Sequence, residues 1–264
     1  MRLGLPIAAI AVLVAIAMLL TEGLTSSDQE PSRTVVQTPP ATKAPSGKPP
    51  VQAEGVNTTQ PAKPAWRGPR HLTALVPRRT QLRDRPHGRP IAALPARTTW
   101  KSPRVLFVAK RRDGWLGVVA PELPNGHIGW IPHSIARIYP VSWELRADLS
   151  ARRVTLMHAG RVVRRVPVAI GGPGTPTPRG RFAVTDKLEV KAASPYGCCI
   201  LALSGHQPNI AQGWGGGDRI ALHATTNEAT VGSAVSHGCL RARARDMKVL
   251  IREVPLGTPI YIKA

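Results

Sequence analysis

The sequence predicts a mostly β protein with one short helix near its C-terminal end. From residue 67 onward, short apolar stretches alternate with turn sequences that contain Gly, Pro, Asn and Asp. Apolar residues recur at helical spacing close to the C-terminus, at Met247, Leu250, Ile251 and Val254. The chain has 264 residues, which exceeds the usual size of one domain, so we expect two folded domains behind a non-globular N-terminal part.

The first 24 residues indicate an export signal. Residues 3–20 are uncharged and almost wholly apolar, and Arg2 precedes them. A segment of this length suffices for a marginal membrane span or for the core of a signal peptide. No clear small-x-small cleavage site follows, so we favour an uncleaved signal anchor over a cleaved signal peptide. Because Arg2 favours keeping the short N-terminus inside, both alternatives predict that the bulk of the chain is extracytoplasmic.

Residues 25–66 are expected to form a disordered linker. They contain eight prolines and many Ser, Thr, Gln and Ala residues, and they lack Leu, Ile, Phe and Tyr. A segment of this composition cannot bury enough apolar surface to fold. It would act as a spacer that lifts the folded part of the chain off the membrane.

Residues 67–139 predict a small all-β barrel. Turn sequences such as Asp113-Gly114 and Asn125-Gly126 separate short apolar segments. The predicted strands are Thr73–Val76, Thr80–Leu82, Ile91–Leu94, Val105–Val108, Trp115–Val119 and Gly129–Ile131.

The charge of the chain is strongly positive. Its formal net charge is +21, and residues 67–112 hold thirteen Lys or Arg residues against one acid, Asp84. This basic segment is either a solvated face or a surface for an anionic partner, such as a bacterial wall polymer or lipid headgroups. No nucleic-acid recognition motif is present, and the basic residues are not interleaved with a stacking aromatic platform. We therefore do not expect a nucleic-acid partner.

Residues 141–264 predict a second, β-rich domain. The segments Arg153–Met157 and Val162–Ile170 flank Ala159-Gly160 and predict a β-hairpin. The predicted helix follows residue 239. The domain opens with Trp143–Leu149, and further strands are expected at Gly180–Thr185, Ile200–Leu203, Arg219–His223 and Thr258–Ile262.

Three cysteines are an odd number, which implies at least one free or intermolecular thiol in an exported chain. Cys198 and Cys199 are adjacent, so they either form a vicinal disulfide or pack as small buried side chains. We favour packing. Cys239 is then the thiol that has a reason to be free.

The sequence Ser236-His237-Gly238-Cys239, with His223 upstream, points to nucleophilic chemistry. A thiol has an unperturbed pKa of about 8.5 and attacks as the thiolate, so an imidazole that takes its proton would activate Cys239. Gly238 permits a sharp turn in which the N–H groups of Gly238 and Cys239 could form an oxyanion hole. Spacing alone does not decide whether His223 or His237 is the base. The three side chains are also possible zinc ligands, but paired-ligand spacing is absent, so we expect no metal or cofactor.

The segment from His223 to Arg241 resembles the signature of L,D-transpeptidases of the YkuD type: a histidine, twelve residues, then Ser-His-Gly-Cys-Leu-Arg. Residues 171–182, 201–205 and 220–225 resemble further segments of the family, in the expected order. The resemblance covers roughly residues 141–264. Residues 113–131 loosely resemble bacterial Src-homology-3-like wall-associated domains, which makes the predicted barrel a candidate wall-binding domain.

The family resemblance implies an acyl-transfer enzyme that acts on the peptide stems of bacterial peptidoglycan, in the cell wall or periplasm. Cys239 would attack the carbonyl before a terminal D-alanine, and an amine acceptor would resolve the thioester. His223 would be the base, oriented by the carbonyl of Ala224, and Arg241 would meet a substrate carboxylate.

The same resemblance assigns Ser236, His237, Gly238 and the Cys239 N–H to the oxyanion site or to substrate binding. Two alternatives stay open. One is an L,D-carboxypeptidase that uses water as the acceptor, and the other is a non-catalytic wall-binding protein.

Overall fold

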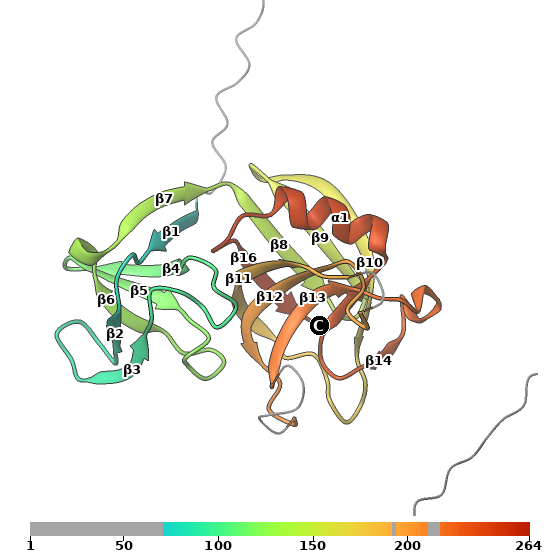
Figure 1. Ribbon diagram of the computed structural model, residues 1–264, viewed down its shortest axis with the longest axis horizontal. Helices are drawn as coiled ribbons and strands as arrows, with labels where there is room; N and C mark the ends of the chain where they lie inside the picture. The colour runs from blue at the N-terminus through green and yellow to red at the C-terminus, as the bar shows by residue number, and fades with distance from the viewer. Residues whose placement is uncertain (1–70, 192–193, 211–216) are drawn as a thin grey trace, which may run out of the picture. The chain divides into compact units, whose positions relative to one another are not determined.

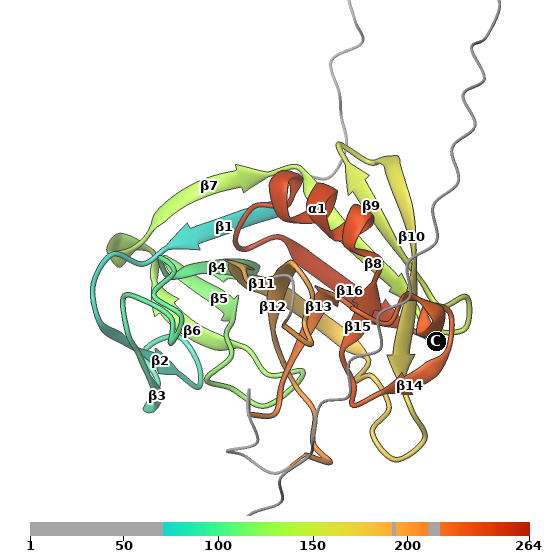
Figure 2. The same cartoon turned by 45° about the vertical axis from the view of Figure 1, so that its right-hand side comes forward.

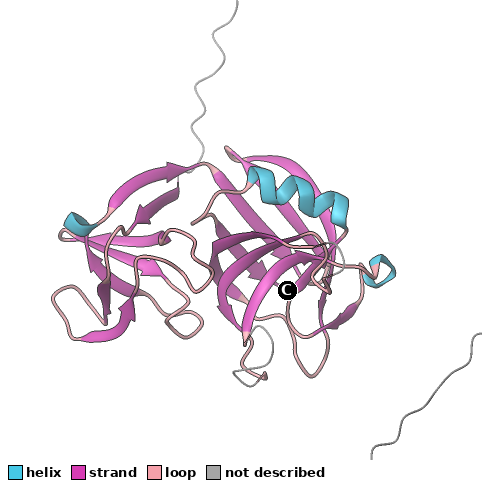
Figure 3. Cartoon of the chain, viewed as in Figure 1, coloured by secondary structure: helices cyan, strands magenta, loops and turns pink. Residues whose placement is uncertain are grey.

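The computed structural model describes residues 71–191, 194–210 and 217–264. This part contains sixteen strands, one α-helix and two short 3₁₀ helices, so the predicted mostly β fold class is confirmed (Figure 3). The expected signal segment (residues 1–24) and linker (residues 25–66) lie outside the described residues. Within the described residues, no helix is long and apolar enough to cross a bilayer.

Seven strands form a first sheet, in the order β3-β2-β6-β5-β4-β1-β7. Every pairing in this sheet is antiparallel. The strands are β1 (His71–Leu75), β2 (Thr80–Arg83), β3 (Pro90–Leu94), β4 (Val105–Arg112), β5 (Trp115–Val119), β6 (Gly129–Pro132) and β7 (Arg137–Val141).

The first sheet has its own hydrophobic core. Leu82, Leu94, Leu106, Leu116 and Ile131 are at most 1% exposed and pack together. They come from five of the strands that the apolar segments predict. The seventh strand, β7, was not predicted because only its last residue is buried, which leaves no alternating apolar pattern to detect.

Nine strands form a second sheet, in the order β14-β10-β15-β13-β12-β11-β16-β8-β9. Three of its pairings are parallel: β10 with β14, β13 with β15, and β16 with β8. The strands are β8 (Trp143–Asp148), β9 (Arg153–His158), β10 (Arg161–Gly171), β11 (Gly180–Glu189), β12 (Cys199–His206), β13 (Arg219–Ala224), β14 (Ala234–Ser236), β15 (Leu240–Ala242) and β16 (Pro259–Lys263).

The long strand β10 closes the second sheet on itself. Its first part, Arg161–Pro167, pairs with β9 as the predicted hairpin, and its next residues, Val168 and Ala169, pair with β15. A register irregularity between Val162 and Arg164 accompanies this course, as expected where a bulge bends a strand. Strands β9 and β15 stand far apart in the sheet order, so β10 joins them into a ring (Figure 2).

The predicted C-terminal helix is confirmed as α1 (Ala244–Glu253). It packs on β12 and β13 (Figure 1). Its apolar side chains Met247 and Leu250 are fully buried in the core of the second sheet, together with Leu201, Leu222 and Leu240. The helix thereby covers β13, the strand that carries His223.

The two sheets belong to one compact unit and are joined by polar contacts. The amide of Asn125, in the loop before β6, donates to the carbonyl of His206 at 2.7 Å and accepts from its N–H at 2.8 Å. Thr98, in the loop after β3, donates its hydroxyl to the buried carboxylate of Asp186 on β11. These contacts fix loops of the first sheet against β11 and β12 of the second.

Candidate active site

The Ser236-His237-Gly238-Cys239 segment is a tight turn between β14 and β15. The Ser236 hydroxyl donates to the Cys239 carbonyl at 2.6 Å and accepts from the Gly238 N–H at 3.1 Å. Gly238 has φ +106°, and a Cβ there would lie 2.5 Å from Nε2 of Gln207. Glycine is therefore required both for the backbone conformation and for the approach of Gln207.

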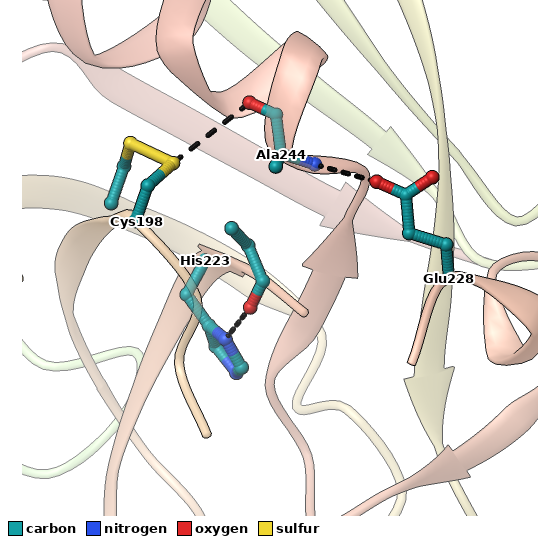
Figure 4. The surroundings of a disulfide bond; sticks show 6 residues. Cys198, His223, Glu228 and Ala244 are labelled. Atoms are coloured by element: carbon teal, nitrogen blue, oxygen red, sulfur yellow. Dashed lines mark hydrogen bonds between the residues drawn. A yellow bond between two sulfur atoms is a disulfide. The ribbon is translucent and has the colours of Figure 1, made fainter. Parts of the chain in front are cut away.

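The parallel pairing of β13 with β15 brings His223 to this turn. His223 lies opposite Arg241 in the register, two residues after Cys239. Its imidazole is 3% exposed, and its Nδ1 lies 2.5 Å from the carbonyl oxygen of Ala224, the contact that the family resemblance implies (Figure 4). When Nδ1 carries the proton and donates it to Ala224, Nε2 is the ring nitrogen that can act as a base.

Tyr196 packs edge-on against the other side of this imidazole. The two ring centroids are 5.0 Å apart, with an interplanar angle of 71°. The structure places its ring both against His223 and in the wall of the cavity described below.

The histidine and the cysteine are both neutral at neutral pH. Burial lowers the pKa of His223 to about 4, and the positive charge of Arg241 acts in the same direction against hydrogen bonding to the backbone of Ala224 and Tyr196. Burial also raises the pKa of Cys239, partly offset by a backbone hydrogen bond at Ala221 and by the charge of Arg241. The resting site therefore holds a thiol and an uncharged imidazole in the wall of one cavity, and such an imidazole can accept a thiol proton during attack.

One cavity of about 440 Å³ gathers the predicted functional side chains. His223, His237, Cys239 and Arg241 all line it. Nε of Arg241 is buried and has no hydrogen-bond partner among the described residues. Such a donor can be satisfied by a ligand in the cavity, and a guanidinium suits a carboxylate.

The remaining predicted residues, Ser236, Gly238 and Ala224, are not among those that line the cavity. Ser236 and Gly238 hold the turn together, and Ala224 contacts His223 through its carbonyl. Because the Gly238 N–H donates to Ser236, the Cys239 N–H is the remaining donor of the two that the sequence suggested for an oxyanion hole.

Gln207 is a site residue that the sequence analysis missed. It is 1% exposed, and its amide donates to the carbonyl of Pro176 at 2.8 Å while accepting from the Asn209 N–H at 3.1 Å. It thereby connects the loop after β10 to Gly238. A lone glutamine in a polar stretch offers no sequence signal for this role.

The expectation that Cys198 and Cys199 pack as thiols is wrong, because they are joined by a disulfide (Figure 4). The two residues are neighbours in the chain, and they stand at the start of β12, where the Cys198 sulfur faces the carbonyl of Ala244 at 3.9 Å. Cys239 is the free cysteine of the described residues. No group of three His, Cys, Asp or Glu side chains in the described ranges is arranged to hold a metal ion.

The sequence matches a known family over the second sheet. Residues 142–262 match the YkuD family, described as the L,D-transpeptidase catalytic domain. The YkuD protein of Bacillus licheniformis is 32% identical over 122 residues, which cover 46% of this chain and 66% of that protein. The YkuD protein of Bacillus subtilis strain 168 is 32% identical over 124 residues, covering 47% of this chain and 68% of that protein.

The chain thus spans about two thirds of the length of these relatives. Among solved structures, an L,D-transpeptidase from Mycobacterium smegmatis aligns with 23% identity and a TM-score of 0.38, over 54% of this chain and 69% of that one. The sequence matches show that this chain belongs to the YkuD family of L,D-transpeptidases.

Proposed function

We propose that this chain forms a thioester between Cys239 and a peptidoglycan tetrapeptide stem, releases D-alanine and transfers the acyl group to an amine acceptor. The observation that carries the proposal is the gathering of Cys239, His223 and Arg241 in one cavity of a YkuD-family chain. The reaction serves cross-linking or remodelling of the wall. It needs no metal or organic cofactor, because the thiol is the nucleophile and the imidazole moves the proton.

His223 takes the proton of the Cys239 thiol as the sulfur attacks the scissile carbonyl. The sulfur–carbon bond forms, the bond to the D-alanine nitrogen breaks, and His223 passes the proton to that leaving amine. The acceptor amine then attacks the thioester, and its proton returns to the thiolate by way of His223. The Ala224 carbonyl stabilises the transient imidazolium, and the Arg241 charge stabilises the thiolate.

The oxyanion of the tetrahedral intermediate is bound by the Cys239 N–H, with His237 and the Ser236–Gly238 turn shaping the site. The hydrogen bonds of Ser236 hold this turn before substrate arrives, which favours stabilisation of the transition state without reorganisation. Arg241 binds a substrate carboxylate through the donor that has no partner in the described residues.

The parts of the chain outside the second sheet place this chemistry at the wall. Residues 3–20 anchor the chain in the cytoplasmic membrane, residues 25–66 act as the spacer, and the enzyme works outside the cytoplasm. The first sheet is a wall-associated domain of the Src-homology-3-like type, and its exposed arginines contact anionic polymers. Support for this comes from the sequence: the apolar start, the proline-rich composition and the +21 charge.

The test uses the purified full chain and its Cys239→Ala variant with disaccharide-tetrapeptide stems, analysed by mass spectrometry. With the unchanged chain, we expect cross-linked dimers that lack one D-alanine, and a mass increase of the protein by the acyl group. The Cys239→Ala variant should give neither. Tripeptide products without dimers would assign an L,D-carboxypeptidase. Stems of several wall types that all stay intact would contradict the proposal and favour a wall-binding protein.

A further inference from the structure

The first sheet contributes an aromatic side chain to the catalytic cavity. Trp100 lies in the loop between β3 and β4, and it lines the same cavity as His223 and Cys239. It is 36% exposed, so its indole is open to a ligand. Nothing in the proposed acyl transfer uses this residue.

The loop that carries Trp100 is held by its own hydrogen bonds. The Thr98 N–H donates to the Ser102 carbonyl at 3.0 Å, and the Lys101 N–H donates to the Thr98 carbonyl at 3.0 Å. The Thr98 hydroxyl accepts from the Ser102 N–H at 3.1 Å and donates to Asp186 on β11. Thr98 and Asp186 are both buried, so the loop is fixed to the second sheet two residues from Trp100.

The indole of Trp100 lies over the guanidinium of Arg219, 5.4 Å from its central carbon. Arg219 is in turn held by the Leu203 carbonyl, at 2.8 Å from Nε, and by the Thr185 hydroxyl, at 2.9 Å from Nη2. Arg219 is the first residue of β13, and His223 is the last but one. Side chains four residues apart in a strand point to the same face. At about 3.3 Å per residue, the strand separates them by about 13 Å.

That distance matches the donor stem. An extended chain spans about 3.3–3.6 Å per residue, so a stem that lay along β13 with its scissile carbonyl near His223 would reach Arg219, on which Trp100 stacks, after three to four residues. In a tetrapeptide stem attacked at its third residue, this is the end of the stem that is joined to the sugar.

The polar groups at this end of the cavity already have hydrogen-bond partners. Arg219 donates to a backbone carbonyl and a hydroxyl as described above, and the carboxylate of Asp218 lies 2.9 Å from Nδ1 of His206. The charged end of a diamino acid side chain would require free partners of both signs. A neutral group with apolar faces instead suits an exposed indole among side chains such as Ile220 and Ile210.

We propose that Trp100 binds the sugar-proximal end of the donor stem, namely its first residue and the sugar that bears it. This inference rests on the proposed function and adds a specificity determinant to it. The first sheet thus takes part in choosing the donor, because it completes the cavity that the second sheet begins. The enzyme is expected to prefer stems that still carry their sugars over free peptides.

The test measures binding by calorimetry in the Cys239→Ala background, which prevents turnover. The two probes are a disaccharide-tetrapeptide and the same tetrapeptide without sugar. Trp100→Ala is expected to raise the Kd of the disaccharide-tetrapeptide about tenfold and that of the free tetrapeptide less than about twofold. Trp100→Phe should recover most of the loss. Tyr139→Ala, which removes a 47% exposed aromatic of β7 outside the cavity, is the matched control and should change neither Kd.

Equal weakening of both probes would overturn the inference, since a merely structural role of Trp100 would act in that way. No weakening of either probe would overturn it too. Turnover by the unchanged chain is measured alongside. If the unchanged chain turns over its substrate and Trp100→Ala changes neither Kd, this inference alone is rejected. If the unchanged chain shows neither turnover nor binding, the proposed function is rejected with it.

Discussion

The two sheets differ in how their strands meet. The first sheet is wholly antiparallel, whereas the second contains three parallel pairings and closes through β10. One of those parallel pairings, β13 with β15, places the strand that carries His223 next to the strand that follows Cys239. Parallel neighbours require long connections, so distant segments of the chain come together there. The comparison shows that the position of the site residues depends on the pairing register of strands distant in sequence. The strand pairing of the first sheet depends more on short local turns.

The largest contrast should appear between histidines of the two sheets. His223→Ala is expected to lower kcat/KM for cross-linking by about 10²–10⁴-fold, because the base is removed from the thiol. His87→Ala removes an exposed histidine that packs on Trp115 in the first sheet, and should leave kcat/KM within about twofold. Steady-state kinetics with disaccharide-tetrapeptide measures both. More than a tenth of the original activity in His223→Ala would refute its role as the base.

Two glycines with positive φ give the next contrast. Gly197 has φ +65°, and a Cβ there would lie 2.5 Å from the Cβ of Ala224, the residue whose carbonyl holds His223. Gly197→Ala should lower the free energy of unfolding by about 3 kcal/mol and activity by at least about tenfold, because His223 is displaced. Gly114 has φ +76° with open space around it, so Gly114→Ala should cost about 1 kcal/mol from backbone conformation and leave activity unchanged.

Denaturant unfolding and kinetics on the same preparations measure these effects. If Gly197→Ala and Gly114→Ala behave alike, the contact between Gly197 and Ala224 does not position His223.

The buried histidine also makes stability depend on pH. Its pKa is about 4 in the folded chain and about 6.5 in the unfolded chain, so the unfolded state binds the proton more readily. The contribution of His223 to the free energy of unfolding is fully present above pH 6.5. It is lost as pH falls from 6.5 to 4, by about 3 kcal/mol in total. In urea unfolding at several pH values, the free energy of unfolding should change less steeply with pH for His223→Gln than for the unchanged chain. Equal slopes would mean that the pKa of His223 is the same in the folded and unfolded states.

The smallest effect is expected from reduction of the disulfide. Cys198 and Cys199 are adjacent, so their bond closes no loop whose entropy would stabilise the fold. Reduction should change the free energy of unfolding by less than about 1 kcal/mol. Thiol titration in denaturant should count one thiol before reduction and three after it. Three thiols before reduction would show that the two cysteines are not bonded.

Much of the fold could be predicted because its signals are local. Apolar segments between Gly and Asn turns predicted six of the seven strands in the first sheet, and helical spacing predicted α1. Strands β14 and β15 were missed because each has three residues, too few for a periodic pattern. The closure by β10 has no local signal, since it depends on which distant strands pair.

The site divides in the same way. Cys239 and His223 could be singled out because a motif with fixed spacing carries them. Gln207 and Trp100 could not, because they reach the cavity only through tertiary packing of separate loops. The preference for packed thiols at Cys198 and Cys199 failed because sequence adjacency does not determine oxidation state.

The sheet orders also bear on self-association of this β-rich chain. An unpaired strand edge is a template for pairing with another molecule, and native sheets protect such edges with proline or by closure. Of the described strands in the first sheet, β3 and β7 are outermost, and each contains a proline, Pro90 and Pro140. The second sheet removes most of its edges through β10. The two sheets thus limit edge-to-edge pairing by different means: the first through proline in its outer strands, and the second through closure of the sheet.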